Sequence, residues 1–221
     1  MSTSSSMSQQ IAQVKAASAA RLPEHVREVF LQQIAANINA GAPADLAALD
    51  TEVPDLALIA PDGTRSSLSH AMADKPAVLV FYRGAWCPYC NVALRVYGQD
   101  LFPELQTRGI ALVAISPQTT DGSLSMQEKH ELAFPVLSDP GNRLASFFGI
   151  VMAPRSQELR SAQEEMGADV PGANFDGTED VPIATVAILT PERRLRWLDV
   201  RPDHTARTDV PEILAALAVL N

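Results

Sequence analysis

The chain has 221 residues, which is enough for one sizeable domain with an appendage but too few for two full domains. Its hydrophobic fraction of 47% and charged fraction of 19% are those of a folded globular protein, which excludes a disordered or collagen-like chain. The 17 Lys and Arg residues and the 26 Asp and Glu residues give a formal net charge of −9, so we expect no binding to nucleic acid or to an anionic membrane surface.

The apolar runs of the sequence are short. The longest, residues 77–82 and 110–115, fall far below the roughly 20 residues that a membrane-spanning helix needs. The first ten residues carry no positive charge and no apolar stretch follows them, so no secretory signal is expected. We therefore expect a cytoplasmic location and no membrane partner.

The N-terminal part divides into a tail and a helical extension. Residues 1–7 are Ser-rich and are expected to be disordered, because they offer no apolar surface to offset the entropy of ordering. Residues 8–50 are predicted to be a helical N-terminal extension with helices over 11–20 and 23–40, since Val26, Phe30 and Ile34 recur at helical spacing. A redox domain over residues 51–221 is expected to follow.

The remaining sequence alternates strand and helix patterns. We predict a hairpin over 55–66, a short helix over 67–73, buried strands over 77–82 and 110–115, a helix with a kink near Pro103, and a polar loop over 116–122. A helix that starts near Ser125, a strand over 134–137, helices over 141–148 and 158–166, a hairpin over 183–200 and a helix over 210–220 complete the pattern. This alternation predicts an α/β fold.

The two cysteines are the most informative residues. Cys87 follows a buried strand and precedes a helix, so the helix N-terminus and the positive charge of Arg83 favour its thiolate. Cys90 lies about one helical turn further on, within disulfide reach, and is expected to be more buried and protonated. We therefore predict Cys87 as the nucleophile and Cys90 as the resolving thiol.

A cysteine pair can also serve without redox chemistry, in a zinc site or in ordinary core packing. A zinc site would need two further ligands, but the sequence has no third cysteine and its four histidines are widely scattered. Core packing is the second alternative, since free Cys often lies in protein cores. A Cys-x-x-Cys directly after a buried strand favours redox chemistry. We expect this chemistry to need neither a metal nor a cofactor.

Three segments resemble a known family. FYRGAWCPYC (81–90), AISPQTTDGSLS (114–125) and AFPVLSDPGNRLA (133–145) resemble bacterial peroxiredoxin-like proteins of the alkyl hydroperoxide reductase and thiol-specific antioxidant family. The resemblance covers roughly residues 53–220, and the helical extension also looks like that of this subgroup. It implies a thioredoxin-like fold, with a central mixed sheet flanked by helices, and a thiol peroxidase in which Cys87 is the peroxidatic cysteine and Pro88 the proline after it.

The sequence departs from the family pattern at two places, just before Cys87 and at the start of the late strand. Gly84 stands where the family has a Thr, so the hydroxyl that polarises the peroxide is missing. At the late strand, where many members carry an Arg, this chain has Ile183 and Ala184, which leaves Arg83 or another residue to stabilise the anion. Pro182 is the nearest candidate for the cis-proline that faces the cysteines in thioredoxin-like proteins.

Three functions remain open from the sequence. The first is reduction of hydrogen peroxide or organic hydroperoxides through a Cys87 sulfenic acid and a Cys87–Cys90 disulfide, recycled by a thioredoxin-like or glutathione-linked reductant. The second is a dithiol-disulfide oxidoreductase acting on protein or glutathione disulfides, which the missing Thr favours. The third is a non-catalytic redox sensor or binding module.

Gly84, Trp86 and Thr119 are the candidate substrate-binding residues. Trp86 adjoins the nucleophile and would either shape a pocket or pack. Thr119 follows the second buried strand, at the strand edge where α/β proteins place their sites, and would line the entrance or cap a helix. The amphipathic extension also makes a homodimer plausible.

Overall fold

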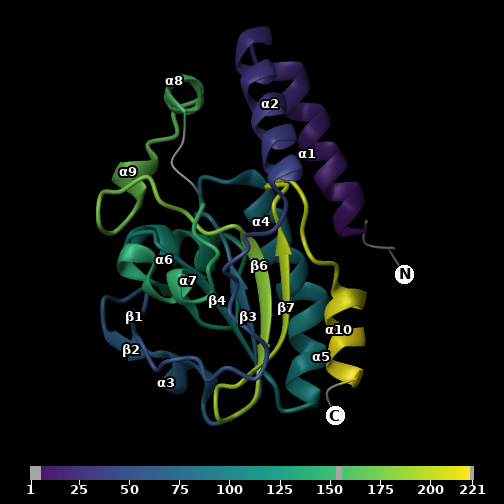
Figure 1. The fold of residues 1–221 in the computed structure, drawn as a ribbon, viewed down its shortest axis with the longest axis vertical. Coiled ribbons are helices and arrows are strands. Elements are labelled where there is room, and N and C mark those ends of the chain that lie inside the picture. Colours follow the sequence, from purple (N-terminus) through teal and green to yellow (C-terminus); the bar gives the residue numbers. More distant parts are fainter. Residues whose placement is uncertain (1–5, 153–155, 220–221) are drawn as a thin grey trace.

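The computed structural model describes residues 6–152 and 156–219, and in them the expected α/β architecture is confirmed (Figure 1). Seven strands form one mixed sheet in the order β2-β1-β5-β4-β3-β6-β7. Strands β3 and β4 are parallel, as are β4 and β5, whereas β6 runs antiparallel to β3 and to β7. The strands are β1 Ala57–Ile59, β2 Arg65–Ser67, β3 Ala77–Phe81, β4 Ala111–Ser116, β5 Val136–Ser138, β6 Ala184–Leu189 and β7 Leu195–Arg201.

Helices cover the sheet and extend beyond one end of it. They are α1 Met7–Arg21, α2 Glu24–Ala40, α3 Leu68–Met72, α4 Pro88–Val96, α5 Phe102–Thr107, α6 Thr120–Lys129, α7 Arg143–Phe147, α8 Gln157–Glu165, α9 Val170–Ala173 and α10 Val210–Val219. No helix within the described ranges is long and apolar enough to cross a membrane.

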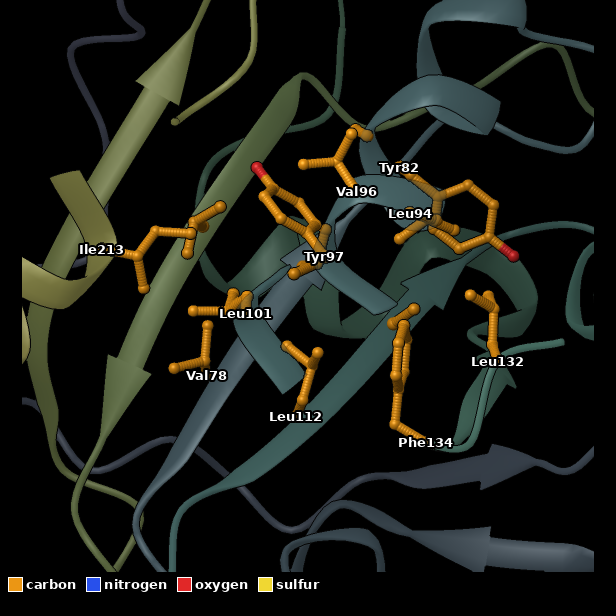
Figure 2. Packing of buried hydrophobic residues seen from close by; sticks show 14 of the residues in the cluster. Val78, Tyr82, Leu94, Val96, Tyr97, Leu101, Leu112, Leu132, Phe134 and Ile213 are labelled. Atoms are coloured by element: carbon orange, nitrogen blue, oxygen red, sulfur yellow. The ribbon is translucent and has the colours of Figure 1, made fainter. Parts of the chain in front are cut away.

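The core lies on both faces of the three central strands. Every residue of β3 and β6 is buried, which explains why β3 is continuously apolar and β6 is apolar except for Thr185, rather than alternating. On one face, Tyr97, Leu101 and Phe134 pack with the side chains of β3 and β4 (Figure 2). On the other face, Phe81 and Phe148 meet edge to face with their ring centroids 5.1 Å apart.

The helix after the cysteine pair contains the irregularity that Pro103 predicts. Helix α4 passes through a π-helical turn, Tyr97–Leu101, into α5, in which Pro103 lies in the first turn. Tyr97 is buried, and its hydroxyl donates a hydrogen bond of 2.6 Å to the Thr208 carbonyl. This bond ties the helix to the loop between β7 and α10.

The two N-terminal helices lie beyond one end of the sheet, at the top of the view (Figure 1). Helix α1 begins at Met7, slightly earlier than the expected start near Ser8, because Ser6 and Gln9 form a capping box and Met7 is buried. Of residues 1–7, which were expected to be disordered, Ser6 and Met7 belong to the start of this helix, and residues 1–5 lie outside the described residues. Ile11 and Val14 of α1 pack against the core beside α4, so the extension lies over the helix that carries the cysteine pair.

The start of α6 differs from the prediction. The expected polar loop over 116–122 is shorter than predicted, since Ser116 still belongs to β4 and α6 begins at Thr120 rather than near Ser125. The Thr119 N–H donates to the Ala173 carbonyl, and the Ser123 hydroxyl bonds that of Ser138 on β5. The start of α6 is therefore set by these long-range contacts and not by the local capping pattern at Ser125.

Candidate active site

The cysteine pair lies where β3 leads into α4, as expected. Cys87 is the N-cap residue of α4, and its carbonyl accepts hydrogen bonds of 3.1 Å from the N–H groups of Cys90 and Asn91. Pro88 occupies the first turn, where its missing N–H costs nothing. The helix N-terminus therefore points its free N–H groups and its positive dipole end toward the Cys87 region.

Two side-chain amides, of the buried Gln118 and the half-buried Asn91, hold the turn before Cys87 in place. Gln118 accepts a hydrogen bond of 2.8 Å from the Ala85 N–H and donates one of 2.5 Å to the Tyr82 hydroxyl. Asn91 donates bonds of 2.7 and 2.8 Å to the carbonyls of Ala85 and Cys87. Sequence reasoning missed both amides, although Gln118 directly precedes Thr119, because nothing local indicates that they reach this turn.

Arg207 is the main residue of the site that sequence reasoning missed. Its Nη2 lies 3.0 Å from Cys90 Sγ and 3.7 Å from Cys87 Sγ, and its Nη1 donates to the backbone carbonyls of His204 and Ala206. The position of Arg207 in the loop before α10, far from the cysteines in the chain, offers no sequence pattern that could reveal it. Arg207 thus brings a cation to both sulfurs in a chain that has Ile183 and Ala184 where many family members carry an Arg.

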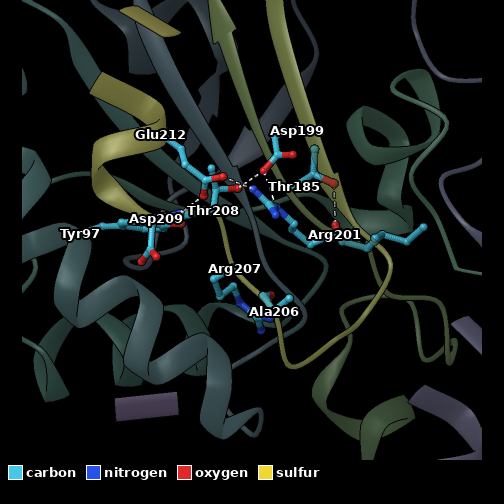
Figure 3. Close-up of polar contacts among 10 residues, drawn as sticks. Tyr97, Thr185, Asp199, Arg201, Ala206, Arg207, Thr208, Asp209 and Glu212 are labelled. Carbon is cyan, nitrogen blue, oxygen red and sulfur yellow. Dashed lines mark hydrogen bonds and ion pairs between the residues drawn. The ribbon is translucent and has the colours of Figure 1, made fainter. Parts of the chain in front are cut away.

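A polar network anchors the loop that carries Arg207 (Figure 3). Asp199 of β7 accepts bonds of 2.6 Å from Arg201 and 2.7 Å from the Thr208 hydroxyl. Arg201 also contacts Glu212 of α10 at 2.7 Å. Together with the bond from Tyr97 to Thr208, this network fixes the backbone on the C-terminal side of Arg207 and so holds its guanidinium at the sulfurs.

The charge of the thiol pair is distributed differently from the prediction. Burial and a hydrogen bond to Cys90 raise the pKa of Cys87 well above its ordinary value. Burial opposes ionisation of Cys90 too, but the hydrogen bond from Cys87 and the Arg207 guanidinium hold the pKa of Cys90 well below its ordinary value. Arg207 and the hydrogen bond between the thiols therefore favour the thiolate on Cys90 over a thiolate on Cys87.

The expected difference in burial between the two cysteines is also absent. Cys87 is 1% exposed and Cys90 0%, so both thiols are buried. The two positions differ instead in what they face. Cys87 lines a cavity that opens beside α1 and α2, whereas Cys90 does not line it and lies closer to Arg207.

Gly84, Trp86 and Arg83 form one stacked unit. The Arg83 guanidinium lies over the Trp86 ring, 4.8 Å from its centroid, and Arg83 is only 6% exposed. Gly84 has a φ of 151°, and a Cβ at this position would come within 2.5 Å of Trp86 Nε1. The Trp86 indole therefore fills the space that a side chain at position 84 would need. This contact explains why position 84 is Gly and not the Thr of the family pattern.

The cavity beside Cys87 has a volume of about 430 Å³. Arg83, Trp86 and Tyr89 form its floor with Cys87, and His204 lies at its side. Its opposite wall comes from α1, α2 and α8, which sequence reasoning did not connect with the site. Burial and the neighbouring Arg83 lower the pKa of His204 to about 3, so this imidazole is neutral near pH 7.

The remaining predicted residues lie outside this arrangement. Thr119 is the N-cap residue of α6, makes no side-chain cap bond and is not among the residues that line the cavity. Pro182 pairs with Val151 next to the sheet, and within the described part of the chain every peptide bond is trans. No group of three or more His, Cys, Asp or Glu side chains suited to a metal ion occurs in the described ranges.

Comparison with known families supports the resemblance seen in the sequence. Residues 49–197 match the sequence model described as the AhpC/TSA family, which covers the cysteine pair but neither the N-terminal helices nor Arg207. A comparison with curated protein sequences finds no match.

Solved structures share the fold. Peroxidoxin BcpB from Mycobacterium tuberculosis superposes with a TM-score of 0.59 at 21% identity, over 78% of this chain and 97% of that chain. A PrxQ Cys-to-Ser mutant from Xylella fastidiosa gives 0.60 at 14% identity, over 81% and 99%. A yeast mitochondrial 1-Cys peroxiredoxin, whose thiol is resolved via glutathione/thioredoxin systems, gives 0.58 at 15% identity, over 79% and 76%. The thioredoxin-like fold of peroxiredoxins is therefore confirmed.

Proposed function

This chain belongs to the AhpC/TSA family and is a peroxiredoxin-like oxidoreductase, and we propose that it reduces hydroperoxides with the Cys87–Cys90 pair. One observation carries the proposal. Two hydrogen-bonded thiols lie at a helix N-terminus within reach of Arg207, and only Cys87 faces the cavity. Substrate would therefore reach Cys87, while Arg207 favours the thiolate on Cys90.

Oxidation begins when the shared proton moves from Cys87 to Cys90 and leaves a thiolate on Cys87. That sulfur attacks the nearer peroxide oxygen and the O–O bond breaks. The leaving oxygen then takes the proton from the Cys90 thiol, which becomes a thiolate again. The products are a Cys87 sulfenic acid and water, or an alcohol where the substrate is an organic hydroperoxide. Arg83 and Arg207 supply the positive charge that stabilises the departing oxygen.

Resolution uses the thiolate on Cys90. Its sulfur attacks the Cys87 sulfenic acid, forms the Cys87–Cys90 disulfide and releases hydroxide, which takes a proton to become water. The low pKa of Cys90 suits this step, because the thiolate is the reactive form. Since both thiols lie at the start of α4, the disulfide needs no partner chain. The homodimer expected from the sequence stays a prediction.

A dithiol reductant then restores the pair by thiol-disulfide exchange, and its two thiols become a disulfide. We propose a thioredoxin-like or glutathione-linked donor, in line with the systems named for the yeast peroxiredoxin. A small-molecule donor could enter through the cavity that Cys87 lines.

Stopped-flow fluorescence of the reduced protein mixed with hydrogen peroxide tests the proposal, because Trp86 adjoins Cys87. We expect a fast, peroxide-dependent second-order change that Cys87→Ser abolishes. Cys90→Ser should still form one sulfenic acid, trapped by dimedone, but should not turn over with a thioredoxin system. Equal residual peroxidase activity in the two variants would overturn the assignment of roles.

The same variants separate peroxide reduction from the second candidate, disulfide exchange. The absence of a side-chain hydroxyl at Gly84 is the observation that favours this alternative. Reduction of insulin or of a glutathione mixed disulfide that is faster than peroxide consumption would establish the exchange reaction and reject the peroxidase.

A further inference from the structure

His130, at the end of α6, contacts the active-site turn through one intermediate side chain. Its Nε2 lies 2.9 Å from Oδ1 of Asn91, although the two residues are 39 positions apart in the chain. The amide of Asn91 in turn donates bonds of 2.7 and 2.8 Å to the carbonyls of Ala85 and Cys87. His130 is therefore one hydrogen bond away from the side chain that holds the backbone of Cys87.

The hydrogen bonds of Asn91 determine which atom of this contact is the donor. An amide has two N–H hydrogens, and the carbonyls of Ala85 and Cys87 accept both. With the amide reversed, its oxygen would face those two carbonyls with no hydrogen between them, so Oδ1 is the atom that faces His130. Since Oδ1 can only accept, Nε2 of His130 carries the hydrogen. The contact survives protonation of His130, because the imidazolium keeps the same N–H.

The fold places His130 beside the active-site helix independently of this bond. His130 is the C-cap residue of α6, and two residues later Leu132 is buried against the turn that follows α4. A Cβ added to Gly98 of that turn would lie 3.1 Å from Leu132 Cδ2, so the two segments approach closely. Burial and the charges of Lys129 and Arg95 lower the pKa of His130, which keeps its imidazole largely neutral near pH 7.

Both ends of α6 therefore act on the same turn. Gln118, two residues before the helix begins, accepts the Ala85 N–H, and His130 at the other end holds the amide that binds the Ala85 carbonyl. Because side chains bind both polar backbone groups of Ala85, this residue cannot rotate without breaking a hydrogen bond. The backbone that leads to Cys87 is thus held from the two ends of one helix.

We propose that His130 is a positioning residue for the cysteine pair and acts through Asn91. By keeping the Asn91 amide turned toward the carbonyls of Ala85 and Cys87, it holds Cys87 at the start of α4. There the thiols of Cys87 and Cys90 form their hydrogen bond. The effect of His130 on turnover rests on the proposed function, whereas its effect on the thiols needs no substrate.

Two substitutions at position 130 separate a positioning role from packing. His130→Leu has a similar volume and removes the donor, whereas His130→Gln keeps a side-chain N–H. The hydrogen bond from Cys87 lowers the pKa of Cys90, so we expect the thiolate absorbance of reduced His130→Leu to titrate at higher pH than that of the wild type. The Cys90 ionisation constant should fall roughly two- to tenfold, the range of one neutral hydrogen bond. His130→Gln should restore the wild-type titration.

A double-mutant cycle tests whether His130 acts through Asn91. Asn91→Leu should shift the thiolate titration at least as far as His130→Leu does, and adding His130→Leu to it should cause no further shift. Nuclear magnetic resonance follows the bond itself in the nitrogen-15-labelled, full-length protein. Above neutral pH, we expect a proton on Nε2 of His130 that exchanges slowly enough to be observed, and we expect Asn91→Leu to abolish its signal.

His70→Leu is the matched control, because His70 is exposed on α3 and makes none of these bonds. We expect it to titrate like the wild type. An unshifted titration in His130→Leu, no recovery in His130→Gln, additive shifts in the double variant, or an equal shift in the control would overturn the inference.

Turnover with hydrogen peroxide distinguishes failure of this inference from failure of the proposed function. We expect slower oxidation of His130→Leu and a rate near that of the wild type for His130→Gln. Peroxide consumption that none of the substitutions at position 130 changes, together with unshifted titrations, rejects the positioning role and leaves the peroxidase standing. A wild type that consumes no peroxide, together with the expected titration shifts, rejects the peroxidase and supports the role of His130 at the thiols.

Discussion

At the scale of single residues, Arg207 favours ionisation of the thiol pair, alongside the hydrogen bond between the two thiols. Its Nη2 lies 3.0 Å from Cys90 Sγ, and its charge is the nearest one to both sulfurs. Removing this charge should raise the pKa of Cys90, so less thiolate would be present near neutral pH. A hydrogen bond to a charged group contributes about 1.5–3 kcal/mol, so we expect Arg207→Gln to slow peroxide oxidation by roughly 10- to 100-fold.

The pH dependence identifies the cause of this loss. Thiolate absorbance and the oxidation rate, both followed against pH, should shift to higher pH in Arg207→Gln and return toward the wild type in Arg207→Lys, which keeps a charge. A glutamine variant that is slow but titrates like the wild type would show that Arg207 only supports the loop.

Gly84 gives a second prediction at this scale. A Cβ there would lie within 2.5 Å of Trp86 Nε1, and the φ of 151° is unfavourable for other residues. Gly84→Ala should therefore displace Trp86 from Arg83, change its fluorescence and lower the free energy of unfolding by more than the ~1–3 kcal/mol of backbone strain alone. Denaturant unfolding measures the loss.

Gly109→Ala is the control for this prediction, because Gly109 also has a positive φ, of 66°, but no atom lies within 4 Å of its added Cβ. We expect a smaller loss of stability and unchanged fluorescence. Equal effects of the two substitutions would mean that Trp86 yields freely and does not explain the absence of a Thr at this position.

At the scale of elements, local patterns identified the strands and the start of the active-site helix. The runs that became β3, β4 and β6 are predominantly apolar because both faces of these strands are covered, and that pattern is visible in the sequence. The position of Cys87 at the start of α4 was equally predictable, since a strand, a turn and Pro88 follow one another directly.

Features that depend on long-range contacts could not be predicted in this way. The start of α6 is fixed by the bond from Thr119 to Ala173, so the capping pattern at Ser125 was misleading. Arg207 and Gln118 reach the site from distant loops, and no periodicity or spacing connects them with Cys87. The same holds for the charge on Cys90, because it depends on which sulfur lies nearer Arg207. Single-sequence patterns report local geometry, whereas this site is completed by tertiary structure.

At the scale of the whole molecule, His204 links acid stability to the packing of three separate segments. Its neighbours are Lys15 of α1, Arg83 of the active-site turn, Asp203 and Arg207 of its own loop, and the Tyr89 ring at 6.0 Å. Burial and these cations lower the pKa of His204 to about 3, whereas an unfolded histidine titrates near pH 6.5. Protonation therefore favours the unfolded chain.

The sign and size of the effect follow from this difference. Above about pH 6.5 both states are neutral at His204 and stability is unaffected, whereas below it the unfolded state alone binds the proton. Each further decrease of one pH unit then lowers the free energy of unfolding by about 1.4 kcal/mol, until the pKa of His204 in the folded state is reached. Between pH 6.5 and pH 5 the loss is roughly 2 kcal/mol. Denaturant unfolding of the full-length protein over this range should show the loss.

Two variants assign the loss to His204. His204→Asn should remove most of the pH dependence between about pH 6.5 and pH 5, because nothing at that position can then take up a proton in the unfolded state. His70→Asn changes an exposed histidine and should leave the dependence intact. If both variants keep the wild-type slope, the acid sensitivity comes from other groups, such as His130, whose pKa burial also lowers, and not from protonation of His204. If only His204→Asn flattens the pH dependence, protonation of His204 causes the loss of stability. Acid would then weaken the packing of α1 against the His204 loop as it destabilises the fold.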